Sequence, residues 1–338
     1  MYINETPVKT WYWLNLNSTD VSMKPVDGKS LKTIKTNAKE TDCVIKETIT
    51  GSGKPFSEFV SVSKTEKKNF VFEKDEVLVI RYKSSYTVSD MLCLYVKENA
   101  KASVYMIFES DENDEACQYI TTKAKIEKNG ELKLYQLSEL SEKSLLFADT
   151  VAVCSENAVF EPHLLYLGSD KTYAGMRAEL EGDSSTLKCE SVYFGTNEKV
   201  YDFNYSVNHY GKKTNSEIFV DGCLNHNSKK SFKGTIDFKT GSSGSVGLER
   251  ENVLLLGDDV ENKTLPIILC SEEDVQGNHG ASIGRIDDNI MFYLQSRGLD
   301  EEQIEILMSS SMIKSRIKNI EDADIQDEMN RFFENLLK

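Results

Sequence analysis

Apolar and polar side chains alternate over short segments from about residue 70 to residue 285. A period of two is typical of a β-strand that buries one face. Turn-forming residues separate these segments, as at Asn129-Gly130 and Asp221-Gly222. No amphipathic segment of helical length lies between them, so alternating βαβ units are not expected. The clearest predicted strands are 70–72, 77–80, 102–108, 132–137, 192–194, 199–205 and 216–220.

Successive strands joined by short turns are compatible with three architectures: a sandwich, a barrel and a β-solenoid. A solenoid stacks similar strands in register and buries a narrow apolar interior between successive coils. No single repeat length recurs along this region. Periodicity alone therefore leaves the three architectures open.

The hydrophobic period becomes helical from Asp287 onward. The glycine at position 298 suits the end of a first helix, and Asp300 with Gln303 forms a capping box for a second. We expect the second helix to bury Ile304, Leu307, Met308 and Met312, and a last helix to bury Ile325, Met329, Phe332, Phe333, Leu336 and Leu337. We therefore divide the chain into an N-terminal docking region (1–70), a strand-rich core (71–286) and a C-terminal helical subdomain (287–338).

Composition narrows the function classes. The 338 residues are 39% hydrophobic and 28% charged, with a formal net charge of -15. Nucleic-acid binding depends on a positive footprint, so this charge argues against nucleic acid and against anionic membrane surfaces. The chain has no run of 18 apolar residues, and 1–5 lack the start of a secretory signal. We expect a cytoplasmic protein that does not bind membranes.

The seven cysteines are dispersed and form no Cys-x-x-Cys pair. A disulfide framework, a zinc ribbon and a ferredoxin-type cluster motif are therefore not expected. Cys270 ends the apolar segment 267–270. We interpret both Cys223 and Cys270 as core residues, because a buried cysteine behaves as a small hydrophobic residue. The cysteines are Cys43, Cys93, Cys117, Cys154, Cys189, Cys223 and Cys270.

Two segments near the N-terminus have other simple interpretations. Gly51-Ser52-Gly53-Lys54-Pro55 is not a Walker A motif, because Thr48 and Pro55 stand where a glycine and a Ser or Thr are required. We predict a loop there. Residues 11–14, which contain both tryptophans, are predicted to dock on the main body as a satellite core.

Four segments carry a family resemblance: 254–257 (Leu-Leu-Leu-Gly), 263–266 (Lys-Thr-Leu-Pro), 274–282 and 292–298. In this order and at this spacing they resemble the C-terminal signature of the SufB/SufD family. Members of that family are scaffold subunits in iron–sulfur cluster assembly. The resemblance implies a mainly β fold, a right-handed parallel β-helix core with a less regular N-terminal region and C-terminal helices. It thus favours the solenoid.

His279 is the candidate site residue that the resemblance implies. His-Gly-Ala-Ser at 279–282 is similar to the His-Gly-Ala-Thr of SufD-like subunits. The family histidine takes part in building the cluster at the interface with the partner scaffold, as a metal ligand or proton shuttle. His209 is similar to a second family histidine, for which we expect a packing role, and His163 is interpreted as structural.

Three positions depart from the family pattern. Gly280 stands where SufB subunits have a functional glutamate, and Glu251 aligns with a SufB cysteine. Gly277 stands where many SufD subunits have a cysteine. The departures indicate a SufD-like subunit. They also imply that the chain alone holds no stable cluster, so that an iron–sulfur cluster is bound only transiently in the complex.

The resemblance also implies partners. These are a SufB-type scaffold subunit and a SufC-type ABC ATPase, with ATP hydrolysis in the ATPase and none in this chain. A cysteine desulfurase or sulfur carrier would act through the complex. The ATPase-binding residues would be Phe292, Tyr293, Ser296, Arg297 and Gly298.

Two alternatives stay open. One is a self-sufficient SufB-type scaffold, which Gly280 and Glu251 disfavour. The other is a carbohydrate-acting β-helix protein, with Asp202 and Glu217 as an imagined pair of acid–base carboxylates.

Overall fold

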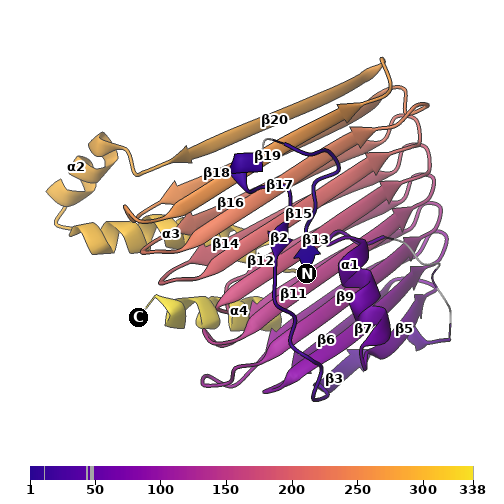
Figure 1. The fold of residues 1–338 in the computed structure, drawn as a ribbon, viewed down its shortest axis with the longest axis horizontal. Helices are drawn as coiled ribbons and strands as arrows, with labels where there is room; N and C mark the ends of the chain where they lie inside the picture. The colour runs from indigo at the N-terminus through magenta and orange to yellow at the C-terminus, as the bar shows by residue number, and fades with distance from the viewer. Residues whose placement is uncertain (11, 43–44, 46–48, 338) are drawn as a thin grey trace.

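The computed structural model describes every residue except 11, 43–44, 46–48 and 338. Predictions about Trp11 and Cys43 therefore lie outside the described residues. The described chain forms a flattened β-solenoid with two long sheets, which confirms the predicted mainly β class (Figure 1). No described helix combines the length and the apolar character needed to cross a bilayer.

Each long sheet contains nine described strands. Sheet 1 consists of β3 (Leu31–Thr36), β6 (Glu76–Lys83), β8 (Lys101–Glu109), β10 (Glu131–Glu139), β12 (Val159–Tyr166), β14 (Thr186–Gly195), β16 (Asn215–Leu224), β18 (Ser245–Leu255) and β20 (Val275–Gly284). Sheet 2 consists of β4 (Lys39–Glu40), β5 (Glu66–Phe72), β7 (Thr87–Val96), β9 (Cys117–Ile126), β11 (Leu145–Cys154), β13 (Lys171–Leu180), β15 (Val200–His209), β17 (Lys229–Phe238) and β19 (Glu261–Cys270). From β5 onward the chain alternates between the sheets, and each strand pairs in parallel with the next strand of its own sheet.

The coils vary in length, which is why no repeat length is visible in the sequence. Glu131 pairs with Val159, 28 residues later, whereas Asn215 pairs with Val246, 31 residues later. One corner nevertheless repeats its geometry. Asn99, Asn129 and Asn157 all have a positive φ of 55–61°, which asparagine tolerates better than most residues. Their side-chain amides form a ladder, because Asn129 Nδ2 donates to Asn99 Oδ1 (2.9 Å) and Asn157 Nδ2 donates to Asn129 Oδ1 (3.1 Å).

The two ends of the solenoid differ. At the end near the N-terminus, β3 and β4 pair antiparallel with β6 and β5 and close both sheets. Lys32 on β3 also forms a 2.6 Å ion pair with the buried Asp90. At the other end, β19 and β20 are edge strands, and β20 is exposed along nearly its whole length. An edge strand presents unpaired backbone groups, so this open end is a template for another chain.

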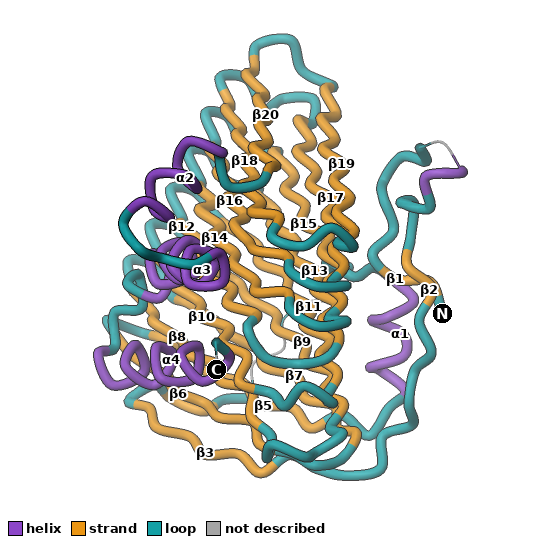
Figure 2. The backbone as a smooth tube through the Cα atoms, turned by 90° about the vertical axis from the view of Figure 1, so that its left-hand side faces the viewer, coloured by secondary structure: helices purple, strands orange, loops and turns teal. Residues whose placement is uncertain are grey.

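Residues before β3 form a strap across the outer face of sheet 2 (Figure 2). The strap includes β1 (Tyr2–Ile3), η1 (Tyr12–Leu14) and β2 (Thr19–Asp20). Asp202 on β15 anchors it, accepting hydrogen bonds from Asn4 Nδ2 (2.6 Å), Thr19 Oγ1 (2.6 Å) and the buried Lys233 (3.0 Å). Trp13 is 73% exposed, so the prediction that it docks in a satellite core is wrong. Its short helix belongs to a segment that stands away from the sheet.

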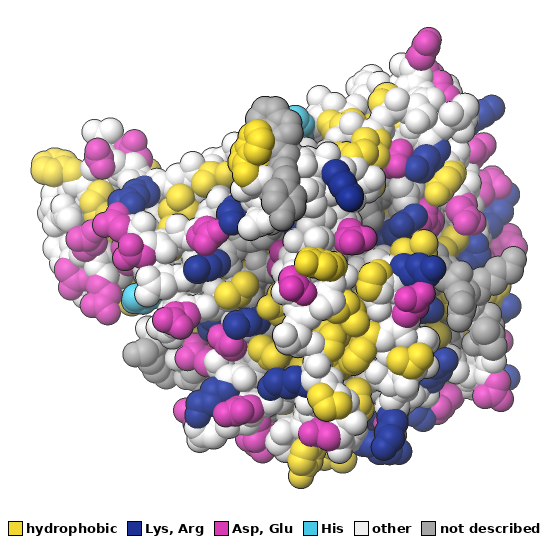
Figure 3. All heavy atoms as spheres, in the orientation of Figure 1, with side chains coloured by type: hydrophobic (Ala, Val, Ile, Leu, Met, Phe, Trp, Pro, Cys, Tyr) yellow, Lys and Arg dark blue, Asp and Glu magenta, His cyan; other side chains and the backbone are white. Residues whose placement is uncertain are grey.

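Residues 51–53 of the predicted loop (51–55) cross sheet 2 at a point where Gly51 lies against Gly175. A Cβ on Gly51 would come within 2.2 Å of the Met176 backbone, and one on Gly175 within 2.2 Å of the Ser52 backbone. The loop leads into α1 (Lys54–Val62), a helix that the sequence analysis did not predict. Phe56 and Val60 of α1 are buried in an apolar cluster that includes side chains of sheet 2, among them Tyr119 and Phe147. Hydrophobic side chains gather in this part of the face shown in Figure 3.

Three helices follow the solenoid in the described chain. They are α2 (Asp288–Ser296), α3 (Glu301–Ile317) and α4 (Ala323–Leu336). Two of them, α3 and α4, lie against sheet 1. The predicted capping box of Asp300 and Gln303 is confirmed. The buried face of α4 contains the predicted Ile325, Met329 and Phe333.

The buried face of α3 was predicted only in part. Ile304 is buried as predicted, but the helix otherwise buries Ile313 and Ile317, and Leu307 is 47% exposed. The described residues of α2 include no buried residue. The helical region therefore packs on the solenoid through α3 and α4, while α2 projects (Figure 1).

Replacing Asp202 by alanine should detach the strap. Loss of the carboxylate leaves Lys233 as an uncompensated buried charge, which costs about 3–5 kcal/mol of unfolding free energy. Urea denaturation measures this loss, and limited proteolysis reports release of residues 1–20. Asp259→Ala, at an exposed position, is the matched control. Equal stability of the two variants would contradict the anchoring role.

Candidate functional site

His279 lies at the open end, in the column of side chains that faces the interior. Residues in register on neighbouring parallel strands share one face of a sheet. Ile218, Glu249 and His279 are in register on β16, β18 and β20. Ile218 and Glu249 are buried inside the solenoid, whereas His279 is exposed because no described strand follows β20. The imidazole thus covers the mouth of the interior.

Glu249 lies one strand below His279 and is only 3% exposed. Its side chain occupies the space beside Gly234, where a Cβ would approach Glu249 Oε2 to 1.9 Å. Burial, together with the negative charge of Glu251, raises the pKa of Glu249 to about 8. This carboxyl group therefore carries a proton at neutral pH.

Glu251 is part of a buried ion pair. Lys230 on β17 reaches across the interior to Glu251, and both side chains are at most 1% exposed. Thr264 Oγ1 donates to the second carboxylate oxygen (2.6 Å) and lies 3.0 Å from Lys230 Nζ. Burial lowers the pKa of Lys230, against the opposing effect of Glu251. The position that the resemblance aligns with a SufB cysteine thus holds a carboxylate whose two oxygens already have partners.

The mouth cluster comprises His279, Glu249, Glu251, Lys230 and Thr264. The sequence analysis singled out His279 and Glu251 but missed Lys230 and Glu249. The available signal was the alternation itself, which places both charges at inward positions of their strands. A charged residue at such a position needs a partner or a shifted pKa.

The two glycines that depart from the family pattern have different surroundings. A Cβ on Gly280 would meet no atom within 4 Å, so nothing in the described chain excludes a side chain there. A Cβ on Gly277 would lie 3.0 Å from Ile268 and 3.1 Å from Phe238. A cysteine at position 277 would therefore require its neighbours to move.

The core interpretation is correct for Cys223 and wrong for Cys270. Cys223 is buried, and burial raises the pKa of its thiol to about 12. Cys270 is exposed, because it ends the edge strand β19 and no described strand packs above it. The other described cysteines are buried.

Two further histidines lie in closed surroundings. His209 is buried, and its ring centre lies 4.7 Å from that of Phe238. Its Nδ1 lies 2.6 Å from the Thr214 hydroxyl, and its Nε2 lies 2.9 Å from the Ser216 hydroxyl. Burial lowers the pKa of His209 to about 4, so this histidine is neutral. His163 lies between Glu161 (3.3 Å) and Glu190 (3.5 Å) under α3.

The predicted ATPase-binding residues form a separate site on α2. Phe292 is 73% exposed and Tyr293 is 54% exposed. The Arg297 guanidinium lies 5.2 Å from the centre of the Tyr293 ring, and Ser296 Oγ donates to the Tyr293 carbonyl (2.7 Å). Gly298 ends the helix with a φ of 93°. Figure 1 shows α2 beyond the ends of the strands, directly after β20.

The imagined carbohydrate-cleaving pair does not exist in this fold. Asp202 faces outward from sheet 2 and is bound by Lys233, whereas Glu217 lies at an outward position of sheet 1. The two carboxylates are therefore on opposite outer faces of the solenoid. A glycosidase needs its two carboxyl groups within about 10 Å on either side of one bond.

Several known proteins are similar in sequence to this chain. Residues 80–312 match the family model described as SUF system FeS cluster assembly, SufBD core domain. The chain is 30% identical over 129 residues to the iron–sulfur cluster assembly protein SufD of Bacillus subtilis, covering 38% of this chain and 30% of that protein. It is 25% identical over 201 residues to SufD of Escherichia coli, covering 60% and 48%. A chloroplastic SufBD family protein of Arabidopsis thaliana, ABCI8, is 27% identical over 155 residues, covering 46% and 28%. The chain thus matches less than half the length of each relative.

Substitution of Lys230 tests the mouth cluster as a folded unit. Lys230→Met should lower the unfolding free energy by about 3–5 kcal/mol, because Glu251 is left charged and buried. The double variant Lys230→Met/Glu251→Leu should recover most of this loss. Urea denaturation of the wild type, both single variants and the double variant measures the coupling. Additive losses in the double variant would contradict the pairing.

Proposed function

We propose a specific role for this chain, which belongs to the family of SUF-system iron–sulfur cluster assembly proteins that share the SufBD core domain. In this proposal it is a SufD-like scaffold subunit that acts in the cytoplasm. In this proposal the chain itself catalyses no reaction. The observation that carries the proposed scaffold role is the difference between the two ends of the solenoid. One end is closed by antiparallel strands, and the other presents two open edges with His279 at the mouth between them.

The open end supports pairing with a second solenoid. The edges of β19 and β20 lie side by side, so a partner with the same architecture can extend both sheets at once. Such pairing also covers the inward-facing side chains of the last coil, which are otherwise exposed. The proposed partner is a SufB-type scaffold subunit.

The projecting helix α2 supports the second proposed partner, a SufC-type ABC ATPase. Exposed aromatic side chains are frequent anchors of protein interfaces. Phe292 and Tyr293 have this exposure, and Leu307 on α3 adds a third exposed apolar side chain. ATP hydrolysis is assigned to the partner, because the segment at 51–55, a short loop that runs into the first turn of α1, lacks the Walker A sequence. A cysteine desulfurase or sulfur carrier would act through the complex.

The mouth cluster supports transient rather than stable cluster binding by the chain alone. His279 offers one exposed nitrogen ligand, while Glu251 is held by Lys230 and Thr264. Iron–sulfur clusters prefer thiolate ligands, and neither position 251 nor position 277 supplies one. The remaining ligands would therefore come from the partner. The same facts disfavour a self-sufficient SufB-type scaffold.

Truncating the aromatic side chains of α2 should weaken ATPase binding without unfolding the chain. Loss of one interface anchor costs about 2 kcal/mol or more, which is about 30-fold in affinity. Phe292→Ala and Tyr293→Ala should each show this loss, measured by calorimetric titration with a SufC-type ATPase. Their melting temperatures should stay unchanged, because α2 buries no described residue.

Leu31→Ala is the matched control for this test. Leu31 is 71% exposed but lies on β3, at the closed end. Wild-type affinity in both α2 variants would contradict the assignment of this helix to the ATPase.

Replacing His279 by alanine should separate assembly from cluster formation. The side chain is exposed, so its loss should leave the melting temperature and the pairing with a SufB-type subunit nearly unchanged. The yield of cluster in the reconstituted complex, followed by visible absorbance, should fall strongly because a ligand or proton carrier is lost. Asn278→Ala is the control on the neighbouring, outward-facing position. A full cluster yield in His279→Ala would sink the role assigned to this histidine.

A further inference from the structure

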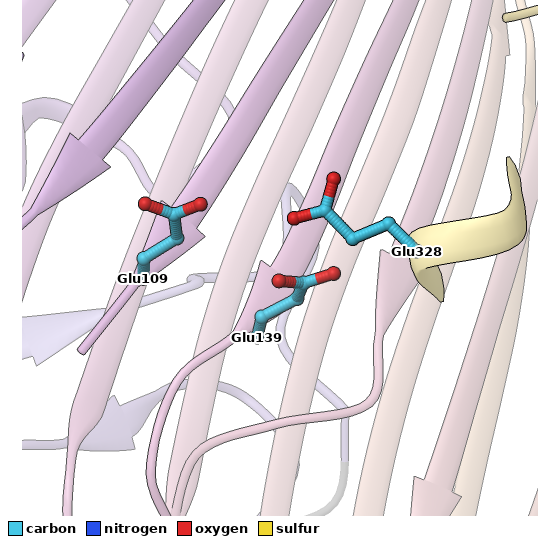
Figure 4. A group of neighbouring side chains, drawn as sticks. All are labelled: Glu109, Glu139 and Glu328. Carbon is cyan, nitrogen blue, oxygen red and sulfur yellow. The ribbon is translucent and has the colours of Figure 1, made fainter. Parts of the chain in front are cut away.

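Helix α4 is fixed to sheet 1 by two kinds of contact. Its apolar side buries Met329 and Phe333, and the Phe333 ring meets Phe194 edge-on at 5.2 Å. On a neighbouring side, Glu328 extends toward the ends of β8 and β10 (Figure 4). There it joins Glu109 and Glu139, and carboxylate oxygens of the three residues lie within 4.8 Å of one another.

One cation serves this cluster directly. Arg81 on β6 donates Nη1 to Glu328 Oε1 (2.8 Å) and Nη2 to Glu328 Oε2 (2.5 Å). The same guanidinium also contacts Glu109. Glu139 contacts Glu328 beside this ion pair, but its own Oε1 is buried and makes no hydrogen bond to any described residue.

Other charged groups nearby do not supply the missing cation. The cluster borders a groove of about 1180 Å³ between α4 and the turns that follow β8 and β10. Lys83 in this groove pairs with Asp111 (2.6 Å), Lys143 with Asn113 (3.3 Å), and Glu142 pairs with Lys199 (3.2 Å). The groove also contains Glu112 and His226.

A proton on Glu139 reduces the charge imbalance. Three ionised carboxylates around one guanidinium would leave two negative charges in a partly buried place. A protonated Glu139 removes one of them and gains an O–H that can donate to Glu328. Burial, followed by the charges of Glu328 and Glu109, raises the pKa of Glu139 to about 8, although Arg81 opposes the rise.

We propose that Glu139, Glu328 and Arg81 form a proton-dependent latch that holds α4 against the solenoid. With the proton in place, α4 is held by both the apolar contacts and the latch. When the proton leaves Glu139, carboxylate repulsion weakens the docking of α4 and the apolar contacts remain. The latch thus sets how firmly α4 is fixed, while α3 keeps its own contacts with sheet 1 through Ile313, Ile317 and Arg316.

The direction of the pH effect follows from the raised pKa. A carboxyl group that binds its proton more tightly in the docked state favours docking at low pH. Docking should therefore weaken as the pH rises from the ordinary range of a glutamate toward 8, and level off above it. With a docked pKa of about 8, the opening of α4 should increase about tenfold between pH 7 and pH 9.

Hydrogen exchange of the α4 amides tests the latch in the full chain. At each pH, the exchange rate of each amide in the wild type is divided by its rate in Glu139→Gln, so that the intrinsic pH dependence of exchange cancels. Glutamine keeps the shape of the protonated side chain but cannot ionise. The ratio should rise about tenfold between pH 7 and pH 9 in α4 and stay flat in β11. Glu131→Gln, at the other end of the same strand, should behave like the wild type.

Two results would overturn the latch. One is a ratio in α4 that stays flat between pH 7 and pH 9. The other is slower exchange of α4 on adding millimolar Mg²⁺ or Ca²⁺ to the wild type but not to Glu139→Gln, since a metal ion would then neutralise the cluster. Should Glu139→Gln fail to fold, the exchange rates of α4 and β11 are compared within the wild type. Their ratio should rise about tenfold between pH 7 and pH 9, and a flat ratio would overturn the latch.

Discussion

Hydrogen bonding between successive coils is the constraint on which the rest of this structure depends. Each strand of the solenoid satisfies its backbone groups on the coil before it and the coil after it, so every coil needs neighbours of matching register. The first coil obtains its second neighbour from the antiparallel strands β3 and β4. The last coil has no such neighbour among the described residues. The open end is thus a direct consequence of how the fold satisfies its backbone, and it is the physical basis for the proposed partner.

The narrow interior imposes a second constraint, because charges inside it are costly unless they are neutralised. Three solutions occur in this chain. Lys230 and Glu251 neutralise each other, Glu249 keeps a proton, and Asp90 near the closed end is paired with Lys32. Two of these solutions lie next to the open end. Stacking a second solenoid there would bury the mouth cluster further, so the chemistry of His279 would be set by a charge-balanced interior below it and by the partner above it.

The segments that cover the outer faces of the two sheets are held in place by different contacts. The strap on sheet 2 is anchored by one buried carboxylate, Asp202, with a lysine of the same sheet as its partner. The helices on sheet 1 are held by an apolar cluster and by the charged contacts of Arg81 and Arg316. The contact at Arg81 includes a carboxyl group in excess of the available cations, which is what makes the docking of α4 sensitive to protons.

Local patterns in the sequence predicted most of the strands, the capping box at Asp300 and part of the buried face of α4, because each depends on residues close together in the chain. The turn expected at Asp221-Gly222 lies instead within β16. The order of four segments between 254 and 298 predicted the family, which the matched family model confirms. The role of His279 stays a prediction. The repeat was hidden because turn lengths differ from coil to coil, although the asparagines at 99, 129 and 157 marked one corner of three successive coils. Only the tertiary structure decided that Glu249 lies beneath His279, that Glu251 is bound by Lys230, that Cys270 is exposed and that Glu328 meets Glu139. These contacts join residues up to 189 positions apart, from 139 to 328, and depend on register between coils and on how the helices pack. Hydrophobic alternation specifies which side of a strand faces inward, but it does not specify which strand lies opposite.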